Sequence, residues 1–325
     1  NLAADGFEVT VLEKNDVPGG RARQFSAQGF VFDMGPSWYW MPDVFEQFFA
    51  RFGKKVSDYY DLVRLDPSYT IHFGPGDRMD LPAGQEALEQ MFEHYEPGSA
   101  PRLRKFLAEA EYKYRVGMTE FVHKPSHSIR EFADWRIVSS LFRLQMFTSM
   151  SKHVKSLFRH EKLIKLLEFP VLFLGATPEK TPALYSLMNY ADLALGTWYP
   201  QGGMYKIVEA MTLLAQSLGV KIVLNAEVAQ INTEGGKATG VRTRDGLVFA
   251  ADAVVGAADY HHVESKLLST ETRNYNESYW QSRVMAPSCL IFYVGVSKRL
   301  DHLLHHNLFF DEDFGRHARE IYETP

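Results

Sequence analysis

The runs FEVTVLEK (7–14) and VPGGRAR (17–23), near the start of the chain, decide the fold. In the first run Val9 and Val11 alternate with polar residues, and this period of two predicts a strand. The strand ends on an acid, Glu13, and a glycine-rich loop follows it. In a dinucleotide-binding βαβ unit, the second strand ends on an acid that accepts hydrogen bonds from a ribose.

The G-x-G-x-x-G loop that should lie about 20 residues before that acid is missing. Residues 1–6 (NLAADG) instead have the pattern of a helix end closed by Gly6. We therefore expect that the glycine loop lay upstream of this chain. Residues 321–325 contain no closing element either, so we expect truncation at both ends. From the strand and its acid alone, a solvated Glu13 at a strand end is the favoured interpretation.

The loop after the strand is suited to a phosphate. Gly19 and Gly20 allow backbone N–H groups to approach it, and the Arg21 guanidinium matches its oxygens. An ordinary turn with a surface arginine remains the alternative. A further strand, within GFVFDMGPSW (29–38), then enters a Gly-Pro-Ser turn.

Together these motifs resemble the FAD-dependent amine-oxidase-like flavoproteins, and most closely the phytoene desaturase-type carotenoid desaturases. The runs TWYPQGGM (197–204) and LNAEV (224–228) strengthen the resemblance. It implies an α/β fold in which a Rossmann-like FAD-binding domain is interleaved with an α+β substrate domain. We expect the FAD-binding domain at 1–65 and 200–260, and the substrate or membrane-facing domain at 66–199 and 261–325.

The resemblance also implies roles for individual residues. Those that it places around FAD are Glu13 on the ribose, Gly19, Gly20 and Arg21 on the pyrophosphate and flavin side, Arg23, Gly35 and Ser37 near the ring, and Val228 on the adenine. Asp192 is nominated as the proton acceptor, with an acid on a helix surface as the alternative.

The implied reaction is desaturation of a long apolar polyene, phytoene or a related carotenoid precursor. Hydride passes to flavin N5 and a proton leaves the neighbouring carbon, while the protein orients the chain. Quinone or oxygen is the expected electron acceptor. The alternatives are a carotenoid isomerase, a retinol-saturase-like enzyme or another amine-oxidase-like flavoenzyme. A non-catalytic polyene-binding protein and an NAD-dependent dehydrogenase are further alternatives, and the Gly-Gly-Arg loop argues against both.

Composition sets broader limits. The 325 residues are 46% hydrophobic, enough for a sizeable core, and a net charge of −5 gives no basic footprint for nucleic acid. The single cysteine, Cys289, fits a reducing, cytoplasmic setting, and we interpret it as a core residue of a strand at 289–296. No apolar run has the roughly 18 residues of a membrane span. The histidine pairs lack a cysteine or acid cluster of recognised spacing, so we expect no metal site.

A basic amphipathic stretch covers residues 136–165. It carries seven Lys or Arg residues against the single acid Glu161, and its apolar residues recur every three or four positions. Such a stretch binds anionic membrane surfaces, and we expect peripheral membrane association through it. A helix pair with one solvated basic face is the alternative.

Overall fold

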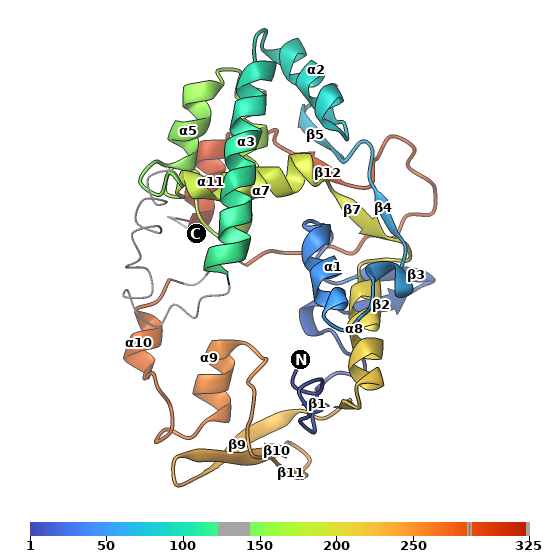
Figure 1. Ribbon diagram of the computed structural model, residues 1–325, viewed down its shortest axis with the longest axis vertical. Coiled ribbons are helices and arrows are strands. Elements are labelled where there is room, and N and C mark those ends of the chain that lie inside the picture. Colours follow the sequence, from blue (N-terminus) through green and yellow to red (C-terminus); the bar gives the residue numbers. More distant parts are fainter. Residues whose placement is uncertain (123–143, 285, 287, 323–325) are drawn as a thin grey trace. The chain divides into compact units, whose positions relative to one another are not determined.

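The computed structural model describes residues 1–122, 144–284, 286 and 288–322. It divides into two compact units, the first made of Asn1–Ser37 and Gly202–Ala286 and the second of Trp38–Gln201 and Pro287–Pro325. Each unit therefore joins segments that are distant in sequence (Figure 1).

The first unit contains a parallel strand pair, an antiparallel three-stranded sheet in the order β11-β10-β9, and a β2-β3 hairpin. Its elements are β1 (Thr10–Leu12), η1 (Gly20–Ala22), β2 (Gln24–Ala27), β3 (Phe30–Asp33), α8 (Tyr205–Ser217), β8 (Lys221–Val223), β9 (Val228–Glu234), β10 (Lys237–Thr243), β11 (Val248–Ala250), α9 (Tyr260–His262), η8 (Val263–Leu267) and α10 (Glu277–Gln281). The parallel pair is β1 with β8, in the register Val11 opposite Ile222.

The chain begins with one helical turn. The Gly6 N–H donates to the Ala3 carbonyl, the Phe7 N–H donates to the Leu2 carbonyl, and Gly6 has φ +92°. These are the paired hydrogen bonds of a Schellman helix end, which uses glycine because the backbone is left-handed there. The predicted helix end at Gly6 is confirmed.

The second unit is mostly helical and carries a three-stranded sheet in the order β12-β5-β6. Its elements are α1 (Pro42–Ala50), η2 (Val56–Asp58), β4 (Leu62–Arg64), β5 (Tyr69–Gly74), β6 (Asp77–Leu81), α2 (Gln85–Tyr95), α3 (Ala100–Val116), η3 (Gly117–Phe121), α5 (Met150–Leu157), α6 (Glu161–Glu168), η5 (Phe169–Leu174), η6 (Ala183–Ser186), α7 (Leu187–Asn189), η7 (Tyr190–Ala194), β7 (Trp198–Pro200), β12 (Asn307–Phe309) and α11 (Phe314–Tyr322). Strand β12 lies parallel to β5, although the paired residues Leu308 and Ile71 are 237 positions apart in the sequence (Figure 1).

One hydrophobic core fills the second unit. It joins the β5-β6 hairpin to helices α2, α3, α5 and α6, with fully buried members such as Ile71, Phe92 and Phe106. Lys113 on α3 is also buried, and its ammonium donates to the Ala183 carbonyl and to the side chains of Gln145 and Ser186. These bonds satisfy a charge that burial would otherwise penalise.

The basic stretch 136–165 is described from residue 144 onward, and its first part lies outside the described residues. Helices α5 and α6 follow, and their apolar residues Met150, Val154, Phe158 and Leu163 are buried in the core. Packing within the protein therefore accounts for the amphipathic period from residue 150 onward.

The run 289–296 differs from its predicted structure. It forms no strand, Cys289 is exposed, and Leu290 and Phe292 are 80% and 77% exposed. A strand requires a hydrogen-bonding neighbour, and no neighbour pairs with this run in the described part of the chain. The prediction of a buried strand with a core cysteine was wrong for this structure.

The unit boundaries do not coincide with the domain boundaries expected from the sequence. Residues 38–65 pack in the second unit because β4 pairs with β7, and Trp198 N–H donates to the Tyr39 carbonyl. Residues 261–286 pack in the first unit, where Val263 and Leu267 meet Ile231 of β9. Which unit holds cofactor and which holds substrate stays a prediction.

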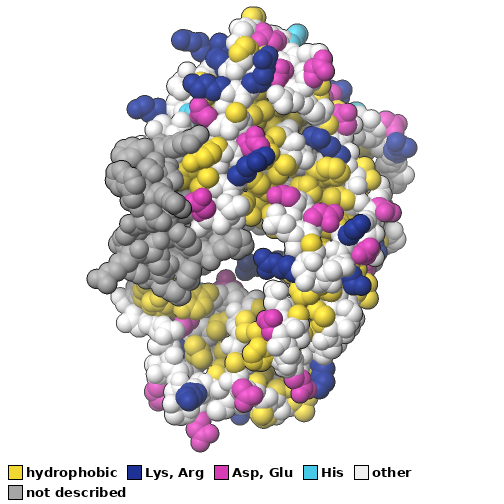
Figure 2. Space-filling view, in the orientation of Figure 1, with side chains coloured by type: hydrophobic (Ala, Val, Ile, Leu, Met, Phe, Trp, Pro, Cys, Tyr) yellow, Lys and Arg dark blue, Asp and Glu magenta, His cyan; other side chains and the backbone are white. Residues whose placement is uncertain are grey.

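Among the described residues, no helix is both long and apolar enough to cross a membrane. On the face shown in Figure 2, Lys and Arg side chains are interspersed with Asp and Glu side chains.

Candidate functional site

Glu13 lies at the carboxyl end of the parallel pair in the first unit. Its backbone N–H donates to the Val223 carbonyl at 2.9 Å, which continues the β1-β8 ladder by one residue. Its carboxylate oxygen Oε1 accepts from the backbone N–H and the side-chain amide of Asn15. The side chain is half-buried, and no further partner of the carboxylate is found in the described part of the chain.

The segment before β9 runs directly beside Glu13. The Ala226 N–H donates to the Glu13 carbonyl and the Asn225 N–H donates to the Asn15 carbonyl, both at 2.9 Å. Val228 begins β9 two residues later and is half-buried. The structure therefore brings together Glu13 and the Leu-Asn-Ala-Glu-Val run, the two motifs that the resemblance assigns to the ribose and the adenine.

The glycine loop adopts a conformation that requires glycine. Gly19 and Gly20 have φ +110° and +55°, and a Cβ on Gly19 would approach the Val208 side chain on α8 to 3.0 Å. Gly35 lies against the same loop, because a Cβ there would overlap the backbone carbonyl oxygen of Arg21. The predicted site residues 19–21 and 35 are thus in direct contact.

The remaining predicted residues of this unit lie around the loop. The Arg21 side chain is 93% exposed and forms a loose ion pair of 3.7 Å with Asp259, which leaves it accessible to an anion. The Arg23 Nε donates to the Met34 sulfur at 3.3 Å. Ser37 is exposed at the last residue of the first segment.

Asp33, which the sequence argument did not single out, connects two motifs. Its carboxylate accepts from the backbone N–H groups of Met204 (2.8 Å) and Tyr205 (3.1 Å) at the start of α8. Gly203 permits this approach, since a Cβ on it would lie 3.0 Å from Asp33 Oδ2. A carboxylate at a helix N-terminus satisfies free N–H groups and stabilises the helix dipole. The acid in the Phe-Asp-x-Gly-Pro-Ser run was the only sequence signal for this role of Asp33. The helix N-terminus that it caps lies about 170 residues further along the chain.

Replacing Asp33 with alanine is expected to lower the free energy of unfolding by about 1–2 kcal/mol, the usual cost of losing a helix cap. Chemical denaturation measures the change. Asp33→Asn should lose less, because the amide keeps one accepting oxygen, and Asp252→Ala is the exposed control in the same unit. Equal effects of the Asp33 and Asp252 alanine variants would contradict the capping role.

Asp192 lies in the second unit and is buried, with 1% of its surface exposed. It accepts hydrogen bonds from the Tyr69 hydroxyl at 2.6 Å and from the Thr197 hydroxyl at 3.3 Å. Thr197 in turn accepts from the Trp40 indole N–H at 2.9 Å. The alternative of a surface acid is therefore wrong, and the carboxyl group is the centre of a buried polar network.

Aromatic rings surround this network. The Trp38 ring packs against Tyr69 with centroids 5.0 Å apart, against His306 at 4.4 Å and against Trp40 at 5.3 Å. Phe173, which is 56% exposed, contacts Trp40 at 5.7 Å. The fully buried carboxyl group thus lies behind an aromatic cluster that reaches the surface.

Burial raises the pKa of Asp192 from 3.8 to about 7, and the hydrogen bonds from Tyr69 and Thr197 partly oppose this rise. No ion pair neutralises the carboxylate among the residues described, so its charged form is costly there. Burial and, to a smaller extent, the contact with Asp192 also raise the pKa of Tyr69. A strongly perturbed acid of this kind marks a candidate functional position.

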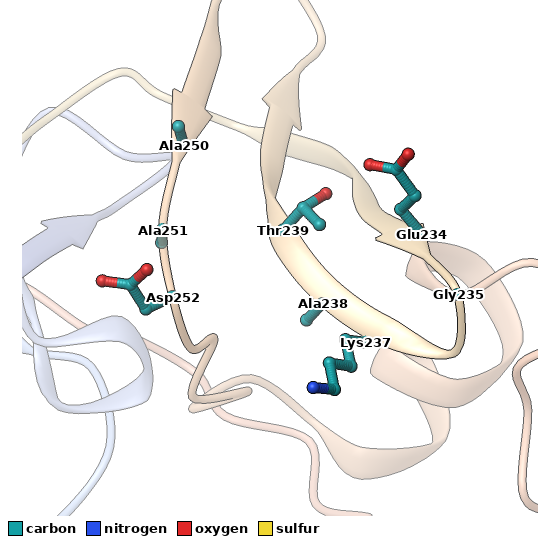
Figure 3. Close-up of a pocket in the computed structure, with 8 residues that line it drawn as sticks. All are labelled: Glu234, Gly235, Lys237, Ala238, Thr239, Ala250, Ala251 and Asp252. Carbon is teal, nitrogen blue, oxygen red and sulfur yellow. The ribbon is translucent and has the colours of Figure 1, made fainter.

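A surface hollow and the arrangement of potential metal ligands give no further candidate site in the described part of the chain. An open hollow of about 710 Å³ lies beside the β9-β10 turn, where Glu234, Lys237 and Asp252 line it together with small residues (Figure 3). It contains none of the predicted site residues and gathers no group suited to their chemistry. In the described ranges, no three His, Cys, Asp or Glu side chains are placed to hold a metal ion.

Comparison with known proteins identifies the family. A family model described as flavin containing amine oxidoreductase matches residues 1–319. The chain belongs to this family. The family predicted from the glycine loop and the Gly-Pro-Ser turn is therefore confirmed.

Curated relatives of this amine oxidoreductase chain are carotenoid desaturases. A carotenoid 3,4-desaturase of Haloarcula japonica is 40% identical over 100% of this chain and 66% of its own length. A zeta-carotene-forming phytoene desaturase of Myxococcus xanthus is 35% identical over 99% of this chain and 62% of its own length. The chain thus spans about two thirds of the length of these relatives.

A solved structure supports the fold. The crystal structure of PF1083 from Pyrococcus furiosus is 20% identical, covers 86% of this chain and 59% of that chain, and has a TM-score of 0.52. At this identity the likeness concerns the mixed helix and strand fold alone.

Proposed function

We propose that the protein is an FAD-dependent oxidoreductase that desaturates a long apolar polyene, phytoene or a related carotenoid precursor. The observation that carries the proposal is the convergence of motifs in the first unit. Glu13 lies beside the run that leads to Val228, and Gly35 touches the Gly-Gly-Arg loop. The carotenoid desaturases among the relatives support the substrate class.

The residues present fit FAD. A half-buried Glu13 at the end of a parallel strand is suited to accept from ribose hydroxyls, as in Rossmann-like domains. The left-handed glycines and the exposed Arg21 are suited to the pyrophosphate, with Arg23, Gly35 and Ser37 on the flavin side and the Val228 backbone at the adenine. When bound, the flavin would accept the hydride that desaturation removes.

We infer that Asp192 does not take the proton from the substrate directly and has a different role. A carboxyl group with 1% exposure does not reach a substrate, and its hydrogen-bond partners Tyr69 and Thr197 are buried as well. Through Thr197 it holds the Trp40 indole, and through Tyr69 it supports the Trp38 ring. Asp192 is therefore proposed as a positioning residue for an aromatic wall along which an apolar polyene would lie.

We further propose that the protein works at a membrane surface, where such a substrate resides. Phe147, Phe173 and Leu174 are exposed on the second unit, at 78%, 56% and 41%. The exposed Lys152 and Lys155 lie on α5 of the same unit. Exposed apolar and basic side chains on one unit favour anionic lipid surfaces.

The test uses the full-length protein purified with lipid. Its visible spectrum is recorded for flavin, and it is then incubated with phytoene in liposomes without a nicotinamide cofactor. Flavin bands together with growing polyene bands are expected. Flavin without new polyene would reject the substrate but keep the cofactor, whereas absence of flavin would reject the assignment of Glu13 and the Gly-Gly-Arg loop. Quinone and oxygen are then compared as electron acceptors.

A further inference from the structure

A second cavity, of about 300 Å³, lies within the second unit and has no part in the proposed flavin chemistry. Residues of four elements line it: Arg64 of β4, Gly84 and Gln85 at the start of α2, Arg104, Leu107, Ala108 and Glu111 on one face of α3, and Tyr190, Leu193 and Ala194 of η7. Two arginines therefore share one small cavity.

Arg64 is held in this cavity without a protein partner for its charge. Its Nε–H is buried and donates to no acceptor, and no ion pair of Arg64 occurs in the described part of the chain. Its guanidinium packs on Gly196, where a Cβ would come within 2.6 Å of Nε. Gly196 thus makes room for the guanidinium. A buried donor left unpaired destabilises the folded protein, so its retention calls for an acceptor.

Neither Glu111, the acid in the cavity lining, nor Glu89, the acid that pairs with Arg104, fills that role. Glu111 forms an ion pair with Arg115 at 2.6 Å. Glu89 accepts from Arg104 Nε at 3.0 Å and from the Gln85 amide at 2.9 Å. The N-terminus of α2 (Gln85–Tyr95) has no side-chain cap, so its free N–H groups add positive potential beside Gln85.

We propose that this cavity binds a phosphate group, supplied either by a small molecule or by a lipid head group. The fork of Arg64 matches phosphate oxygens, and the α2 N-terminus adds to the attraction, while Arg104 is paired with Glu89. The site is independent of the flavin motifs, which lie in the other unit.

The test measures binding of inorganic phosphate to the full-length protein by calorimetry, with sodium chloride matching the ionic strength. Arg64→Gln is expected to weaken phosphate binding by about tenfold or more, the effect of one lost charged hydrogen bond. Arg51→Gln, the same substitution at an exposed position of the same unit, should leave it unchanged. Arg64→Lys keeps the charge but not the fork, and should bind with intermediate affinity.

Gly196→Ala supplies a second variant that keeps both arginines and displaces the guanidinium, and it should also weaken binding. Thermal unfolding without phosphate verifies that each variant is folded. Vesicles of phosphatidylcholine with and without phosphatidic acid separate the two sources: binding that needs both phosphatidic acid and Arg64 assigns the site to a head group, and phosphate binding alone assigns it to a small molecule. No phosphate binding by the unmodified protein, or equal losses in the Arg64 and Arg51 variants, would overturn the proposal.

Discussion

Replacing Gly35 with alanine is expected to yield a protein that purifies with little or no flavin. The added Cβ would overlap the carbonyl oxygen of Arg21, and this atom belongs to backbone that cannot rotate away as a side chain can. The Gly-Gly-Arg loop must then move as a whole. Overpacking of this kind costs about 1–3 kcal/mol or more in the free energy of unfolding. Visible absorbance of flavin per protein and thermal unfolding measure the two effects.

Gly117→Ala is the matched control. A Cβ on Gly117 meets only the Leu187 side chain, at 3.7 Å, and the residue has helical backbone angles. The control should therefore keep its flavin and unfold at the same temperature or slightly higher. If Gly35→Ala is folded and retains as much flavin as the control, then the contact between Gly35 and the loop has no part in cofactor binding.

The sequence allowed much of the first unit to be predicted, because the signals there are local. Alternation within residues 7–14 predicted a strand, which is β1, and the strand expected within residues 29–38 is β3. The pattern of residues 1–6 predicted a helix end at Gly6, and the hydrogen bonds there confirm it. Each of these depends on neighbours within a few residues.

The features that could not be predicted from the sequence depend on contacts between residues that are distant along the chain. The role of Asp33 requires the N-terminus of α8, and the burial of Asp192 requires Tyr69, which lies more than a hundred residues earlier. The run at 289–296 has the composition of a buried strand, but strand formation needs a neighbour that composition does not specify. The amphipathic period of α5 fitted both a membrane surface and a protein core, and the structure places its apolar residues in the core.

The substitution Asp192→Asn is expected to remove a pH dependence of the free energy of unfolding that comes from this carboxyl group. Because the folded state raises the pKa of Asp192 to about 7, the folded protein binds the proton more tightly than the unfolded chain does. Stability therefore falls as pH rises from about 4 to about 7, and changes no further above that range. A difference of about 3 pKa units corresponds to about 4 kcal/mol in the free energy of unfolding. Chemical denaturation at several pH values between 4 and 8 measures this fall.

Asp192→Asn should lack that fall, since the amide does not ionise, whereas Asp61→Asn at an exposed position of the same unit should keep it. Tyr69→Phe removes a hydrogen bond that lowers the pKa of Asp192, so the fall should extend to higher pH. An unchanged pH dependence in Asp192→Asn would show that this carboxyl group does not titrate between pH 4 and pH 7 in the folded protein.

The same variant separates two roles of Asp192 in turnover, provided that the proposed desaturation is correct. A proton acceptor that touches the substrate would lose kcat at every pH when replaced by asparagine, because the amide accepts no proton. A residue that holds Trp40 through Thr197 would mainly raise KM and alter tryptophan fluorescence, since the asparagine still forms hydrogen bonds to its neighbours. The burial of Asp192, together with the Tyr69 and Thr197 hydroxyls that enclose it, favours the second result. The aromatic wall would then depend on a buried acid that never meets the substrate.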